Sequence, residues 1–114
     1  MIIYIGFSTR TYKISARIIC RQYKHCAPVI IKKNSYEIYQ FTKSGQITVI
    51  PIRHQDIKIL EKYGWKFIKY NITKLPNISN IRSLTCVQFT KKFCNIKRFD
   101  IQTPDGLLKY IMTK

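Results

Sequence analysis

Three side chains of this sequence could together perform thiol chemistry: Cys86, His25 and Gln40. Cys86 follows Thr85 at the start of a stretch that predicts a helix running to about Asn95. The start of a helix exposes unpaired backbone N–H groups and the positive end of the helix dipole. Both features favour a thiolate over a thiol, and the thiolate is the nucleophilic form of cysteine.

His25 begins a segment that predicts a strand, and it is the expected general base. Cysteine catalysis also needs a group that orients the base and a donor for the oxyanion, for which the backbone N–H of Cys86 is suited. A hairpin that turns around residues 33–35 would bring residue 25 near the region after residue 40. Gln40 is therefore the predicted partner of the imidazole, and Glu37, nearer the turn, is the weaker alternative.

The segments that must position these residues predict a single α+β domain over residues 1–114. Strands are expected at residues 2–7, 26–32, 36–42, 47–52 and 65–72, and helices at 9–23, 55–63, 86–95 and from 104 onward. The close spacing of the middle strands predicts an antiparallel meander. The expected fold is an antiparallel sheet of about five strands, with helices at both ends and the cysteine-bearing helix packed on it. A stripe of apolar residues at helical spacing puts Cys86 at the top of the buried face of that helix: Phe89, Phe93 and Ile96.

Two segments resemble the permuted papain-like proteins, which include the NlpC-type cysteine peptidases and amidases and their lecithin:retinol acyltransferase-like relatives. Residues 15–17 and 23–30 resemble the histidine segment of that superfamily, and residues 85–96 with 103–111 resemble the cysteine segment of small phage-encoded members. The resemblance covers residues 15–41 and 83–112, and residues 54–82 match nothing in it. It implies a circularly permuted papain-like fold with Cys86 as nucleophile and His25 as base. It also implies a hydrolase or acyltransferase for an amide or ester bond in a peptide, peptidoglycan or acyl substrate, while the third polar position varies in such families.

The chain is strongly basic, with 21 Lys and Arg against five acidic residues and a net charge of +16. Such a field attracts nucleic acid, anionic lipid headgroups or an acidic cell wall. Whether the charge is functional or follows from an Ile- and Lys-rich composition stays open. The alternative function is therefore a non-catalytic, basic module on the same scaffold, associated with a virion or with nucleic acid.

The first residues predict a strand rather than a secretion signal, and no apolar run approaches the ~20 residues of a membrane span. The expected location is the cytoplasm, where the protein is made, or a virion, and the cysteines are expected to be free thiols. No cofactor or metal is predicted. A zinc site of Cys20, Cys26, His25 and Cys94 is disfavoured, because the spacing of Cys20 and Cys26 fits no usual zinc knuckle and no second CxxC motif exists.

Each of these residues also has a simpler interpretation. A cysteine on an apolar helix face is commonly a small core residue, and a histidine at a strand start is commonly structural. Cys26 is expected to point away from His25 into the core, and Cys94 is expected to be inert. His54 could cap a helix, lie on the surface or serve as an alternative base. Residues 65–70 could be a core strand with lysines on its solvent-exposed face. Alternatively, they could present aromatic and basic side chains on which nucleobases stack.

Overall fold

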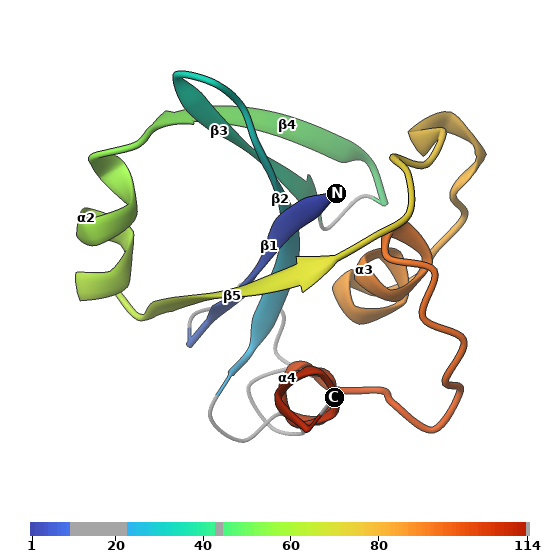
Figure 1. Ribbon diagram of the computed structural model, residues 1–114. Coiled ribbons are helices and arrows are strands. Elements are labelled where there is room, and N and C mark those ends of the chain that lie inside the picture. Colours follow the sequence, from blue (N-terminus) through green and yellow to red (C-terminus); the bar gives the residue numbers. More distant parts are fainter. Residues whose placement is uncertain (10–22, 43–44, 114) are drawn as a thin grey trace.

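The computed structural model describes residues 1–9, 23–42 and 45–113 and shows a mixed α+β fold (Figure 1). A five-stranded antiparallel sheet has the order β4-β3-β2-β1-β5. Its strands are β1 (Ile2–Ser8), β2 (His25–Ile31), β3 (Ser35–Phe41), β4 (Ile47–Arg53) and β5 (Trp65–Asn71). The described residues form three α-helices, α2 (Asp56–Lys62), α3 (Cys86–Phe93) and α4 (Pro104–Met112), and a short 3-10 helix, η1 (Ile78–Asn80).

The expected meander is confirmed, since β2, β3 and β4 pair in sequence order. The sequence did not indicate that β1 would lie between β2 and β5. In that arrangement Ser8 of β1 stands opposite His25 on one side and Trp65 on the other. Three residues from distant parts of the chain thus form one row across the end of the sheet.

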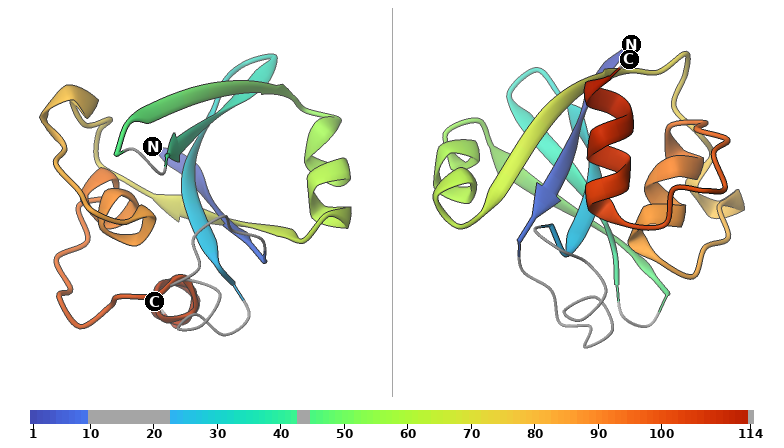
Figure 2. Two further views of the ribbon diagram at one scale, coloured as in Figure 1. Left: turned by 180° about the vertical axis from the view of Figure 1, so that it is seen from behind. Right: turned by 90° about the horizontal axis from the view of Figure 1, so that it is seen from below.

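The main core lies between one face of the sheet and the helices α3 and α4. Ile3, Ile5 and Phe7 alternate along β1 and are fully buried on this face. They pack in one cluster with apolar side chains from both helices: Val87, Phe89, Phe93, Leu107 and Ile111. Figure 2 shows α3 and α4 on the same side of the sheet. Burial of this stripe is what fixes α3, and with it Cys86, against β2.

The other face of the sheet holds a smaller cluster built on Ala27, Val29 and Ile38. Leu60 of α2 packs against it, and α2 connects β4 at one edge of the sheet to β5 at the other (Figure 1). The α3 and α4 helices thus cover one face of the sheet, whereas α2, which has no buried residue, contacts the other face through Leu60. Of the helix expected at residues 9–23, residues 10–22 lie outside the described part of the chain.

Polar contacts of two side chains hold the C-terminal part of the chain in place. The Lys91 side chain is only 6% exposed, and its Nζ donates to the carbonyl oxygens of Arg98 (2.8 Å) and Ile101 (2.6 Å). The backbone N–H of Tyr23, just before β2, donates to the carboxylate of Asp105 in the first turn of α4. The Lys91 ammonium therefore holds the connection between α3 and α4. The backbone N–H of Tyr23 holds the start of α4.

Candidate active site

Cys86 is the first residue of α3, and Thr85 caps that helix. The Gln88 N–H donates to the Thr85 hydroxyl at 3.1 Å, and the Phe89 N–H donates to the Thr85 carbonyl at 3.0 Å. Capping by Thr85 explains why the helix begins at this residue. The first backbone N–H groups of a helix have no acceptor within the helix, so those of Cys86 and Val87 are not used by the helix itself.

His25 is the first residue of β2, and its Nε2–H donates a hydrogen bond to Oε1 of Gln40 on β3. The pairing of Val29 with Ile38 explains the contact. Alternation along each strand puts His25 on the face of Val29 and Gln40 on the face of Ile38, as diagonal neighbours near the end of the sheet. The structure thus brings together His25 and Gln40, whereas Glu37 forms a surface ion pair with Lys32.

The indole of Trp65 stands edge-on to the His25 imidazole, with ring centroids 6.1 Å apart and an interplanar angle of 88°. Trp65 also stacks on Phe67, and its ring lies over Gly6 of β1. A Cβ at Gly6 would come within 2.9 Å of the indole, so only glycine leaves room for this ring. The indole of Trp65 thus packs beside the histidine, which the sequence pattern did not indicate.

The Cys86 thiol meets His25 at the end of the sheet, where β2 and α3 both begin. Contacts with two residues lower the pKa of Cys86 to about 4. The largest effect comes from a hydrogen bond with the Cys26 side chain. A hydrogen bond with His25, the charge of His25 and a hydrogen bond with the Cys26 backbone lower the pKa further. Burial of the sulfur acts in the opposite direction. Nε2 of His25 is engaged with Gln40, and the same ring acts on the sulfur. Such an environment holds Cys86 as a thiolate at neutral pH.

Cys26 belongs to the core, as its position next to His25 on the strand predicted, and it is fully buried. Its contact with Cys86 was not predicted. Burial raises the pKa of Cys26 well above its ordinary value, with the hydrogen bond and charge of Cys86 adding to the effect. Alternation along the strand predicts that the Cys26 side chain points toward the helix-covered face of the sheet. It does not predict which residue this side chain contacts there.

The remaining candidate residues lie apart from this cluster. Cys94 is buried, and burial raises its pKa to about 12. His54 is exposed and stacks on Tyr36, which pairs with Ile31 at the far end of β2 from His25. Cys20 lies outside the described residues. Within the described ranges, no three His, Cys, Asp or Glu side chains gather as metal ligands would.

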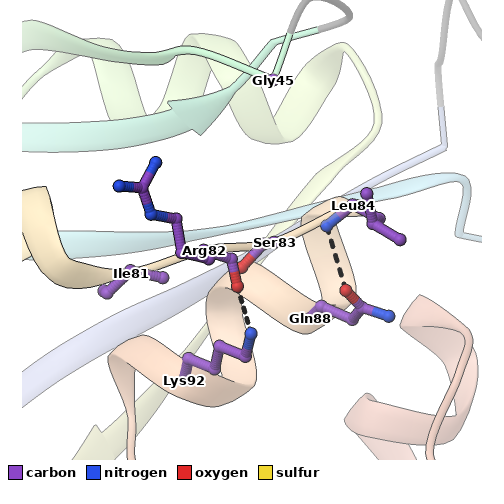
Figure 3. Close-up of a pocket in the computed structure, with 7 residues that line it drawn as sticks. All are labelled: Gly45, Ile81, Arg82, Ser83, Leu84, Gln88 and Lys92. Carbon is purple, nitrogen blue, oxygen red and sulfur yellow. Dashed lines mark hydrogen bonds between the residues drawn. The ribbon is translucent and has the colours of Figure 1, made fainter.

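A surface hollow of about 490 Å³ lies beside the start of α3 (Figure 3). Its lining includes Leu84 and Gln88, which flank Cys86 in the sequence, and the cations Arg82 and Lys92. The Leu84 N–H donates to Gln88 Oε1 at 3.0 Å, and Lys92 Nζ donates to the Arg82 carbonyl. The hydroxyl of Ser83 is buried in this region and has no hydrogen-bond partner among the described residues. The hollow therefore carries polar and cationic side chains, and the described residues that line it do not include Cys86.

No helix in the described part of the chain combines the length and apolar character needed to span a membrane. Comparison of the chain with protein-family models, with curated proteins and with solved structures found no match.

Proposed function

We propose that this protein is a thiol hydrolase or acyltransferase that acts on an amide or ester bond through Cys86, His25 and Gln40. The observation that supports it best is the chain of contacts in which the Cys86 sulfur meets the His25 ring and Gln40 holds Nε2 of that ring. A thiolate, a base and a group that orients the base are the parts that covalent cysteine catalysis requires.

In the first half of the reaction, the Cys86 thiolate attacks the carbonyl carbon of the substrate and forms a tetrahedral adduct. The backbone N–H groups at the start of α3 are suited to stabilise its oxyanion, because they have no acceptor within the helix. His25 then gives a proton to the leaving amine or alcohol as the C–N or C–O bond breaks. The product of this half is a thioester on Cys86.

In the second half, neutral His25 takes a proton from water, or from another acceptor, as that molecule attacks the thioester. Collapse of the adduct releases the acyl product and restores the thiolate. Gln40 holds Nε2 of the ring and so keeps the imidazole in one orientation in both halves. Water as the acceptor makes the protein a hydrolase, and an alcohol or amine makes it an acyltransferase.

The order of the residues along the chain supports a circularly permuted papain-like arrangement. The histidine strand comes first, the orienting amide follows on the next strand, and the nucleophile comes late, at the start of a helix packed on the same sheet. This is the order implied by the resemblance of residues 15–41 and 83–112 to the permuted papain-like superfamily. A peptide, peptidoglycan or acyl substrate is the corresponding proposal.

The test is site-resolved alkylation combined with an activated ester. At about pH 6, limiting iodoacetamide should label Cys86 in the native protein while Cys94 stays unmodified, because an ordinary thiol is largely protonated at that pH. With p-nitrophenyl acetate, nitrophenolate should appear in a burst and mass spectrometry should find the acetyl group on Cys86. His25→Ala should abolish the burst. Equal, slow labelling of all cysteines and no burst would contradict the proposal.

The net charge of +16 favours one alternative, a basic binding module without turnover. It predicts binding to single- or double-stranded DNA whose affinity falls steeply between about 50 and 200 mM salt. Such binding should not change in a Cys86→Ala variant. Binding of this kind together with a negative ester assay would identify the alternative as the better description.

A further inference from the structure

The two most exposed large apolar side chains of the described residues flank α3, and the mechanism above gives them no task. Phe99, on the connection to α4, is 90% exposed, and Leu84, two residues before Cys86, is 80% exposed. Folding gains no hydrophobic stabilisation from side chains that stay in water. Single exposed apolar residues are common on protein surfaces, so the surroundings of these two must show whether they have a role.

Hydrogen bonds hold the backbone around Phe99 in a defined conformation that leaves its ring in water. Lys91 Nζ donates to the Arg98 carbonyl at 2.8 Å, and the Gln102 amide donates to the Phe99 carbonyl. The Arg98 guanidinium donates two hydrogen bonds, of 2.9 and 2.8 Å, to the carboxylate of Asp100. The exposure of Phe99 is therefore a property of the folded loop.

The segment that carries Leu84 lies on the same side of the molecule as this loop. Figures 1 and 2 show the segment before α3 and the connection from α3 to α4 on the side away from α2. Consecutive lysines of α3 hold the two loops, since Lys92 Nζ donates to the Arg82 carbonyl and Lys91 Nζ to the Arg98 carbonyl. The two exposed apolar side chains thus belong to loops that are anchored to the same turn of one helix.

These loops and the last turn of α3 are also strongly basic. They carry five exposed cations against one carboxylate, that of Asp100. The cations are Lys74, Arg82, Lys92, Lys97 and Arg98. By contrast, α2 on the opposite side has two acidic and two basic residues in the sequence DIKILEK. The side away from α2 therefore combines a net positive charge with protruding apolar side chains.

We infer that this side of the protein binds the surface of an anionic lipid bilayer, with Phe99 and Leu84 inserted at the boundary of headgroups and acyl chains. The strength of interfacial binding depends on the buried apolar area and on the attraction of cations to anionic lipids, and these loops supply both. A protein partner would be expected to meet a continuous apolar patch. Nucleobases would stack on Phe99 but would find no such platform in Leu84. The inference does not depend on turnover by Cys86.

The experiment measures cosedimentation of the full chain with vesicles of phosphatidylcholine that contain about 30% phosphatidylserine. The wild type should bind these vesicles at least about 10-fold more tightly than vesicles of phosphatidylcholine alone, because the cations attract the anionic headgroups. Phe99→Ser and Leu84→Ser should each weaken binding about five-fold or more, because each removes apolar area that the lipid buries. Ile59→Ser is the matched control, since Ile59 is 50% exposed but lies on α2.

Two further variants separate the apolar and the electrostatic contributions. Lys97→Gln should weaken binding about five-fold at low salt and have little effect at high salt, where the surface charges are screened. Phe99→Trp should retain binding, and its fluorescence should shift to shorter wavelength when vesicles are added. The wild type, whose one tryptophan is Trp65, provides the reference spectrum. Circular dichroism checks that each variant is folded.

Equal binding to the two kinds of vesicle, or no binding, would overturn the inference. Equal losses of affinity in Phe99→Ser and Ile59→Ser would do the same, because the effect would then not belong to this side of the protein. If a single-stranded oligonucleotide binds in place of the vesicles and Phe99→Ser weakens that binding, the surface recognises nucleic acid and the lipid assignment is wrong. Vesicle binding together with a negative ester assay would contradict the proposed function alone.

Discussion

Nε2 of His25 donates to Oε1 of Gln40 across the β2–β3 pair, 15 residues apart in the sequence. This contact makes the orientation of the imidazole a property of the sheet rather than of a loop. Strand pairing holds both residues, since His25 pairs with Ser8 of β1 and Gln40 pairs with Thr48 of β4.

Removing the Gln40 amide should impair the reactivity of Cys86 without unfolding the protein. In Gln40→Ala the imidazole can rotate away from the sulfur, so we expect on the order of a 10-fold or greater loss in ester cleavage. Gln55→Ala is a suitable control, because Gln55 is exposed and makes no side-chain capping bond at α2. An unchanged burst amplitude and rate in Gln40→Ala would show that the contact does not orient the histidine for catalysis.

Acid should destabilise the protein partly through Cys86. The pKa of Cys86 is lowered in the folded protein to about 4 from an ordinary value of 9.0, so the unfolded chain binds this proton more tightly. The contribution to stability is therefore lost as the pH falls through the folded-state pKa. Between about pH 6 and pH 4, the unfolding free energy of the wild type should fall relative to that of Cys86→Ser, by up to about 1.4 kcal/mol per pH unit. Urea unfolding of both proteins measures this difference, and parallel pH profiles would contradict an ionised Cys86.

Adding one methyl group at Gly6 should disturb the aromatic packing beside His25. A Cβ there would lie 2.9 Å from the Trp65 ring and 3.0 Å from that of Phe67, so Gly6→Ala should destabilise the protein by about 1–3 kcal/mol. Trp65→Leu alone should also destabilise, through lost packing, but the double variant should cost less than the sum of the two. A double-mutant cycle from chemical denaturation measures this coupling. Additive effects would mean that the added methyl group does not act through the indole.

The buried ammonium of Lys91 should stabilise the segment between α3 and α4. Lys91→Met leaves the carbonyl oxygens of Arg98 and Ile101 without their donor, at a cost of about 1–3 kcal/mol. We expect a lowered melting temperature, while Cys86 labelling at low temperature persists because α3 remains anchored by Phe89 and Phe93. Lys97→Met, an exposed lysine in the same segment, should have little effect. Similar melting temperatures for the two variants would argue against the role of the Lys91 contacts.

The sequence alone determined the elements and their faces with considerable success. Alternation along the strands and the stripe of Phe89 and Phe93 on α3 follow from local periodicity, so a linear pattern reveals them. The choice of Gln40 over Glu37 followed from the geometry of a short hairpin, in which residue numbers fix which side chains can meet.

Only the tertiary structure decided which residues surround the thiol. The insertion of β1 between β2 and β5 brings Trp65 beside His25, and the packing of α3 on β2 brings Cys26 against Cys86. Both depend on long-range burial of apolar faces, in which many alternative pairings satisfy the same local pattern. Periodicity predicts the direction in which a side chain points. The residue that it contacts depends on the free energy of packing the whole core.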